Sequence, residues 1–91
     1  AVWACNFVNY CCIVAADILE NKDIPFNVII PLINETTQKV HDINPKDAQT
    51  GPAVRWDKNI IEKQMNLMSS FPSKQAIYGM ISKDIHEQNK Q

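Results

Sequence analysis

The chain has 91 residues, 45% of them hydrophobic, and a formal net charge of −1. This length and composition predict one folded domain with a modest core and argue against intrinsic disorder. A near-neutral charge lacks the dense basic footprint of a nucleic-acid or anionic-membrane surface, so we expect no partner of either kind.

The first predicted helix runs from about Val2 to Asn21. Apolar residues cover most of its circumference, which indicates a helix that is covered on most sides. They form two neighbouring stripes: Trp3, Phe7, Cys11, Val14 and Ile18, then Val8, Cys12, Ala15 and Leu19. Because Asn6, Asn9 and Asp17 interrupt the apolar run and no basic segment precedes it, we interpret it as a buried core helix and not as a membrane span or signal peptide.

Polar residues on this helix give its first candidate site. Asn6 and Asn9 are three positions apart and share one face. A buried asparagine without a partner costs roughly 1–3 kcal/mol, so the pair either forms structural hydrogen bonds or lines a cleft. The three cysteines are odd in number and form no CxxC pair. We therefore expect reduced, buried thiols in a cytoplasmic protein.

Three more helices are predicted, at about 25–42, 57–69 and 72–88. Pro31 predicts either a bend in the second helix or a later start of that helix. Asp57 is a suitable N-cap for the third helix. The residues expected to face inward are Ile29, Leu32, Ile33, Thr36, Val40 and Ile43; Ile60, Ile61, Gln64, Leu67 and Met68; and Ile77, Met80, Ile81 and Ile85. Since no period-two pattern occurs, the chain is predicted to be an all-α domain, a bundle of about four helices spanning residues 1–91.

A loop is expected between residues 44 and 56, and it holds the second candidate site. Gly51 can adopt a positive φ and bring the backbone close to a ligand. Arg55 offers a planar fork for a carboxylate or phosphate. Alternatively, Arg55 pairs with Asp57 or with carbonyl groups at a helix end.

Other chemistry is not indicated. With Gly51 and Gly79 as the only glycines, the chain cannot form a GxGxxG turn, so we expect no cofactor-binding residues in it. His41 and His86 are isolated and expected to be exposed, and no metal set is apparent. No catalytic residue can be assigned.

Two runs carry a family resemblance: PLINET at 31–36 and AQTGPAVRWD at 48–57. With Cys5-Asn6-Phe7, they resemble a family of helical domains that follow a Rossmann-like NAD(P)-binding domain. These are similar to the C-terminal domains of 6-phosphogluconate dehydrogenase-like, pyrroline-5-carboxylate reductase-like and ketopantoate reductase-like proteins. The family pattern is TGP-x-x-R-G-D, with a histidine about seven residues later. Here Trp56 replaces the glycine and Gln64 replaces the histidine. Without that histidine, an acid/base role on the third predicted helix is not supported.

The resemblance implies a C-terminal domain severed from a Rossmann-like partner domain that binds NAD(P) in the full-length protein. One function it implies is the substrate-side and dimerisation domain of an NAD(P)-dependent oxidoreductase, inert by itself. The candidate cleft residues are Asn6, Asn9, Thr50, Gly51, Pro52, Arg55 and Asp57. The alternative is a non-catalytic helical interaction module. We expect a two-fold homodimer, because three further helices cannot cover the apolar first helix.

Overall fold

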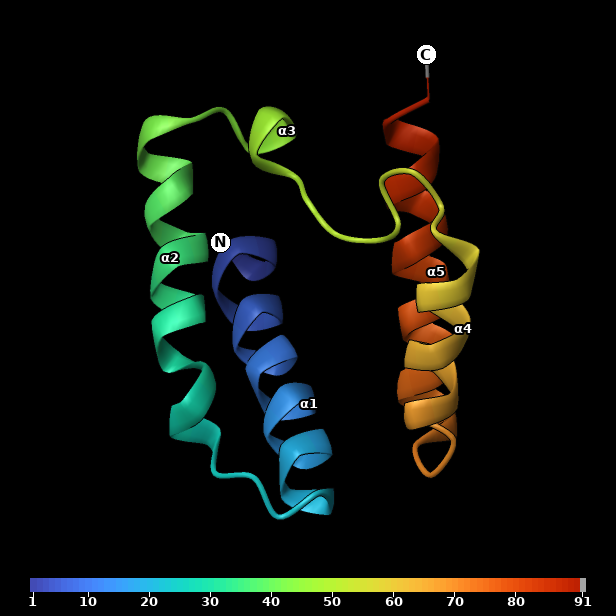
Figure 1. The fold of residues 1–91 in the computed structure, drawn as a ribbon. Helices are drawn as coiled ribbons and strands as arrows, with labels where there is room; N and C mark the ends of the chain where they lie inside the picture. The colour runs from blue at the N-terminus through green and yellow to red at the C-terminus, as the bar shows by residue number, and fades with distance from the viewer. Residues whose placement is uncertain (91) are drawn as a thin grey trace. The chain divides into compact units, whose positions relative to one another are not determined.

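Helices account for all the regular structure in the computed structural model, which describes residues 1–90 (Figure 1). The elements are a π-helix η1 (Val2–Asn6), α1 (Phe7–Asn21), a 3-10 helix η2 (Phe26–Ile29), α2 (Ile30–Asp42), α3 (Pro45–Ala48), α4 (Lys58–Leu67) and α5 (Pro72–Gln88). Four of the five α-helices have seven or more residues. The predicted all-α class is confirmed.

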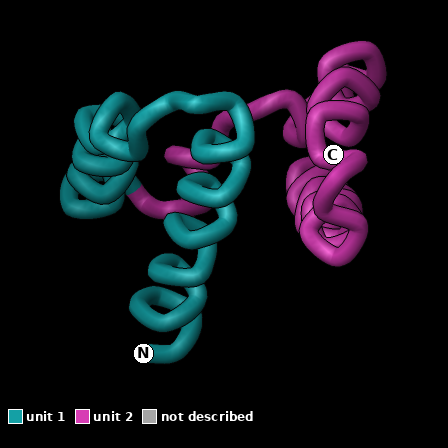
Figure 2. Tube along the Cα trace, turned by 90° about the horizontal axis from the view of Figure 1, so that it is seen from below, with its two compact units in different colours: residues 1–43 teal, residues 44–91 magenta. Residues whose placement is uncertain are grey.

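The chain divides into two compact units, residues 1–43 and residues 44–91 (Figure 2). The first contains η1, α1, η2 and α2, and the second contains α3, α4 and α5. The boundary falls at Asn44, directly before a proline, where the chain leaves the helical conformation.

In the first unit, α1 and α2 lie side by side and are joined by a short connection (Figure 1). The backbone amide of Ile24 donates to the carbonyl oxygen of Leu19 at 2.9 Å, and Asp23 adopts φ 57°. This is the left-handed helix ending in which one residue reverses the chain. Pro31 occupies the first turn of α2, where its missing N–H costs nothing. The expected later start of the second helix is thus confirmed.

The interpretation of the first helix as a buried core helix is wrong for this chain. No residue of η1 or α1 is buried, and Trp3 is 80% exposed. Cys5 and Cys11 are exposed and Cys12 is half-buried, so the expected burial of the thiols is also wrong. The physical reason is that α1 has neighbours on one side only within residues 1–43, and one neighbour cannot cover a helix that is apolar around most of its girth.

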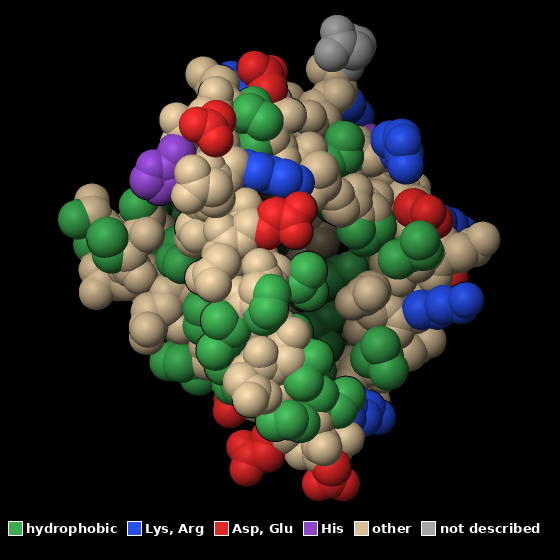
Figure 3. Space-filling model, turned by 60° about the vertical axis from the view of Figure 1, so that its left-hand side comes forward, with side chains coloured by type: hydrophobic (Ala, Val, Ile, Leu, Met, Phe, Trp, Pro, Cys, Tyr) green, Lys and Arg blue, Asp and Glu red, His purple; other side chains and the backbone are tan. Residues whose placement is uncertain are grey.

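The segment Val2–Asn21 also meets the length and hydropathy criteria of a membrane span, with a mean hydropathy of 1.6. This rests on length and composition alone, and core helices of soluble proteins and N-terminal signal sequences meet the same criteria. Hydrophobic side chains are visible at the molecular surface in Figure 3.

Burial on α2 also differs from the expected pattern. Of the six residues expected to face inward, Ile29 and Ile33 are half-buried, whereas Leu32, Thr36, Val40 and Ile43 are exposed. An open groove of about 340 Å³ lies between α1 and α2 and is lined by Leu32 and Thr36 among others. Apolar side chains of the two helices therefore stay exposed in the groove between α1 and α2 and also on the sides that face away from it.

The second unit begins with a helical turn that sequence reasoning had assigned to a loop. Pro45 is the first residue of α3, and the Asn44 Oδ1 atom accepts a hydrogen bond from the Lys46 amide at 3.1 Å. Asparagine as N-cap followed by proline is a strong local signal for a helix start. The turn is four residues long, so no hydrophobic period announces it.

Helices α4 and α5 form the core of the second unit. The bounds of α5 are those predicted, and α4 begins directly after Asp57. The buried residues are Ala53, Ile61, Met68 and Ser82. A Cβ atom on Gly79 would lie 3.8 Å from Cε of Met65. Gly79 on α5 thus faces Met65 on α4, with room for an ordinary side-chain contact.

Five residues of these helices that were expected to face inward are instead exposed. They are Ile60, Gln64, Leu67, Met80 and Ile81. Leu67 is 53% and Met80 is 65% exposed. The inward face of α5 contains Gly79 and Ser82, so counting only large apolar residues assigns this helix the wrong face.

Candidate functional site

Residues Gly51 to Asp57 form a series of tight turns. The amides of Val54, Trp56 and Asp57 donate to the carbonyl oxygens of Gly51, Ala53 and Pro52 at 3.3, 3.2 and 2.8 Å. Gly51 has φ +110°, a conformation that side-chain-bearing residues rarely adopt. The expected positive φ at Gly51 is therefore confirmed. Ala53 is buried and fixes the middle of the series to the second unit.

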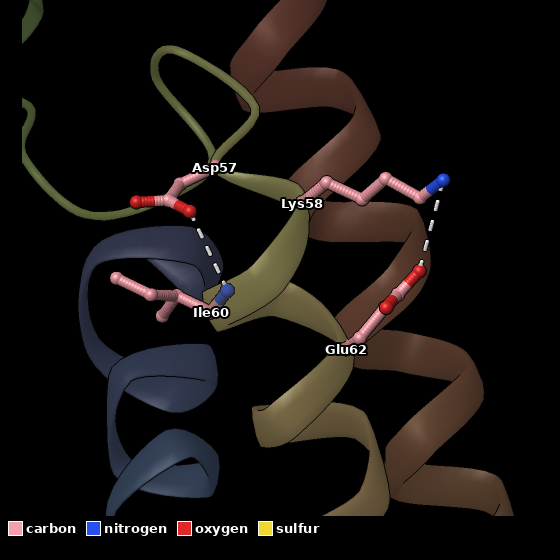
Figure 4. A network of polar contacts seen from close by, with 4 residues as sticks. All are labelled: Asp57, Lys58, Ile60 and Glu62. Atoms are coloured by element: carbon pink, nitrogen blue, oxygen red, sulfur yellow. Dashed lines mark hydrogen bonds and ion pairs between the residues drawn. The ribbon is translucent and has the colours of Figure 1, made fainter.

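Asp57 ends these turns and caps α4. Its Oδ1 atom accepts a hydrogen bond from the Ile60 amide at 3.4 Å (Figure 4). The predicted N-cap is confirmed. Directly after Asp57, Lys58 Nζ lies 4.0 Å from Oε1 of Glu62, but both side chains are exposed and such a pair contributes little. The start of α4 is thus set mainly by the Asp57 cap.

Arg55 lies between these two features and is exposed. Within the described residues its guanidinium forms no hydrogen bond and no ion pair, so the alternative in which it pairs with Asp57 is not realised. An arginine used as a structural strut has partners for its five donors. An unpaired guanidinium on a well-defined turn is instead available to an external carboxylate or phosphate.

Trp56 adopts φ 52°, in the left-handed region. For a bulky residue this conformation is a clear outlier. It explains why the resembling family has glycine at this position, since glycine enters the same region without strain. The tryptophan ring packs against His86 of α5, with ring centroids 5.5 Å apart and an interplanar angle of 49°.

His86 is half-buried, so the expectation that it is exposed is wrong. Its Nδ1 atom lies 3.4 Å from the carbonyl oxygen of Val54. Together with Trp56, Lys83 and Glu87 it lines a shallow pocket of about 280 Å³. Sequence reasoning missed this cluster, although the i, i+3, i+4 spacing of Lys83, His86 and Glu87 does place them on one helix face. The other histidine, His41, is exposed, as expected.

The remaining candidate residues are placed as follows. Thr50 is exposed, and its carbonyl oxygen accepts a hydrogen bond from Nε2 of Gln49 at 2.9 Å; Pro52 is half-buried. Asn6 and Asn9 are exposed in the first unit, so neither needs an internal partner. The structure joins Gly51, Pro52, Arg55 and Asp57 in one series of turns. That Asn6 and Asn9 line a cleft with them stays a prediction.

The described residues do not form a binding site for a dinucleotide cofactor. Gly79 lies inside α5, and Gly51 is separated from the start of α4 by the turns around Ala53, so neither glycine forms a phosphate-cradling loop at a helix N-terminus. Between residues 1 and 90, no three histidine, cysteine or carboxylate side chains are grouped so that they could hold a metal ion.

The described residues thus form an all-helical domain, in which Arg55 has no partner among residues 1–90 and lies on a turn that begins at Gly51. Residues 1–85 match the family described as "Domain of unknown function (DUF2520)", and the chain belongs to this family. A crystal structure of a "putative NADP oxidoreductase" from Bacteroides fragilis is 44% identical in sequence and has a TM-score of 0.92. The similarity covers 94% of this chain and 33% of that one. No curated protein matches the chain.

These similarities confirm the resemblance to helical domains that accompany a Rossmann-like domain. This chain spans about one third of the length of the similar structure. It therefore corresponds to a domain-sized part of that longer protein.

Proposed function

We propose that this chain is the substrate-side and dimerisation domain of a cytoplasmic NAD(P)-dependent oxidoreductase. In this proposal the cofactor is held by a Rossmann-like domain that precedes the chain, and Arg55 binds an anionic group of the substrate. The observation that carries the proposal is the exposed Arg55 guanidinium, which has no partner within the described residues.

The similar crystal structure supports the reaction class. It is of a protein named a "putative NADP oxidoreductase", and this chain matches about a third of it. The described residues lack a phosphate-binding loop of their own, which agrees with a division of labour between two domains. A domain of this kind contributes substrate contacts and subunit contacts, and the nicotinamide comes from its partner domain.

The turn supplies the chemistry that an anionic substrate requires. A guanidinium is always charged and presents two parallel donors to a carboxylate or phosphate. Gly51, at the start of the same turns, leaves its backbone unobstructed, since a Cβ atom there would meet nothing within 4 Å. Asp57 fixes the other end of the turn through the α4 cap. The site is thus suited to orient an acid, and no proton-transfer group is assigned in it.

The dimerisation role is supported by the uncovered apolar residues of the first unit. Val2, Trp3, Phe7, Val8, Tyr10 and Ile13 are all more than 40% exposed. Soluble monomers rarely leave contiguous apolar patches larger than a few hundred Å² exposed. A second copy that covers this face of η1 and α1 removes it from water, and two-fold symmetry is the commonest arrangement.

The role of Arg55 can be tested by kinetics of the full-length protein with NADPH and candidate oxo-acid substrates. Because a hydrogen bond to a charged group contributes about 1.5–3 kcal/mol, Arg55→Ala should raise KM by about 10- to 150-fold. Arg55→Lys should recover part of this loss, since it keeps the charge without the fork. Lys58→Ala is the matched control, because Lys58 is a nearby exposed cation with only a weak pair. An unchanged KM in Arg55→Ala contradicts the proposed role.

The dimer can be tested by sedimentation equilibrium at micromolar concentration. We expect the mass of two chains, and Phe7→Lys should shift the equilibrium toward monomer because it places a charge in the apolar face. Gln38→Lys, which adds the same single charge at an exposed position on α2, is the control for a change of charge alone. A monomer in the unsubstituted protein contradicts the dimerisation role.

A further inference from the structure

The backbone at Trp56 is strained but tightly held. A left-handed conformation at a non-glycine residue costs free energy and persists only where the surrounding structure enforces it. Hydrogen bonds from the amides of Trp56 and Asp57 hold the peptide groups on both sides of this residue. These local bonds alone are equally available to glycine, which takes the same φ without strain. A tryptophan at this position therefore points to a contribution from its ring.

The ring of Trp56 contacts a histidine ring on α5. His86 contacts it at a centroid distance of 5.5 Å, and its Nδ1 lies 3.4 Å from the Val54 carbonyl oxygen, to which Nδ1–H can donate. One half-buried imidazole thus touches both residue 54 and residue 56. These two positions flank Arg55, whose own side chain has no partner among residues 1–90.

We propose that His86 and Trp56 form a clamp that fixes the turn carrying Arg55, so that Trp56 is a positioning residue for the guanidinium. The clamp consists of the Trp56–His86 ring contact and the His86–Val54 hydrogen bond. Its value for function rests on the proposed role of Arg55 in anion binding. An arginine that binds a planar anion through two donors loses less entropy when its backbone is already ordered.

The thermodynamic test is a double-mutant cycle on Trp56→Gly and His86→Ala, read from the unfolding equilibrium constants in denaturant at fixed protein concentration. Trp56→Gly removes the ring and relieves the backbone strain together. His86→Ala should therefore lower the folding equilibrium constant much more in the unsubstituted chain than in the Trp56→Gly variant. We expect a coupling beyond about twofold. Additive effects overturn the clamp.

The positional test is ¹⁵N relaxation of the Arg55 backbone amide. In the unsubstituted chain we expect an order parameter of about 0.85, typical of rigid backbone, and a fall toward about 0.6 in Trp56→Gly and in His86→Ala. Should His86→Ala fail to fold, Trp56→Gly alone decides the outcome, since glycine suits the local φ. His41→Ala is the matched control, because His41 is exposed on α2 and should leave Arg55 unchanged.

An Arg55 amide that stays rigid in both variants overturns the proposal. This measurement needs no substrate, so a failed clamp and a failed anion-binding role are distinguishable. If the relaxation changes while Arg55→Ala leaves KM of the full-length protein unaltered, the clamp stands as an ordering device and the proposed function is wrong. If the clamp positions a binding group, Trp56→Gly raises KM in the full-length protein and leaves kcat nearly unchanged.

Discussion

The side-chain amide of Gln75 donates to the carbonyl oxygen of Met65 at 2.7 Å and thereby joins α5 to α4. Gln75 lies in the first turn of α5, and Met65 is near the end of α4, where carbonyl groups lack helical partners. The bond is half-buried and connects positions ten residues apart. It fixes the corner between the two helices.

Replacing Gln75 by alanine should therefore destabilise the chain. The Met65 oxygen also accepts from the Met68 amide at 3.1 Å, so it keeps one partner. We expect a loss of about 0.5–1.5 kcal/mol, the net value of an ordinary hydrogen bond, from urea midpoints. Gln64→Ala, at an exposed position of α4, is the control and should change stability by less than about 0.5 kcal/mol. Equal effects of the two substitutions would show that the corner bond is not formed.

The core of the second unit should depend on Ile61 and much less on Leu67. Ile61 is 7% exposed, whereas Leu67 is 53% exposed. Ile61→Ala should cost roughly 2–5 kcal/mol as a cavity-forming substitution, and Leu67→Ala about 1 kcal/mol or less because much of that side chain is already in water. Chemical denaturation measures both. The reverse order would restore the inward assignment of Leu67 that the hydrophobic pattern gave.

The two glycines should respond to alanine with opposite signs. Gly51→Ala should destabilise by about 1–2 kcal/mol, because a left-handed conformation is unfavourable for alanine even though its Cβ meets no atom. Gly79→Ala should stabilise by about 0.5–1 kcal/mol, since it lies within α5 and its Cβ would meet Met65 at an ordinary contact distance of 3.8 Å. Thermal unfolding of the pair is the measurement. Destabilisation by both would mean that α4 and α5 are closer than described.

The 91-residue chain by itself should not bind NADPH. Neither glycine precedes a helix N-terminus closely enough to hold a pyrophosphate. Isothermal titration calorimetry at micromolar protein should therefore show no saturable heat, while the full-length protein serves as the positive control. Micromolar affinity in the isolated chain would require a nucleotide site that these residues do not suggest.

The sequence correctly predicted helix starts and backbone conformations that depend on one or two neighbouring residues. Pro72 and Asp57 mark helix starts through their own backbone and side-chain chemistry, and both predictions are confirmed. The positive φ of Gly51 is of the same kind. Burial could not be predicted in this way. Met80 and Leu67 were assigned inward by period, but which face a helix buries depends on the size of the residues opposite, and α5 presents Gly79 to α4.

In the candidate site, too, the locally determined contacts could be predicted and the contacts between elements could not. The cap on Asp57 follows from its position before a helix, so it could be predicted. The contact between Trp56 and His86 could not, because it depends on how α5 is placed against the turn. In the sequence, Trp56 stands out as a departure from the family pattern. Its left-handed backbone now shows why glycine is usual there and why a tryptophan needs a partner.

The exposed thiol of Cys5 gives the chain a chemical reporter on one unit. All three cysteines belong to η1 and α1, and residues 44–91 contain none. Maleimide labelling therefore marks the first unit alone and leaves the Arg55 turn unmodified. The rate of labelling at Cys5 then measures how long that face of the helix stays open to solvent, whichever molecule comes to cover it.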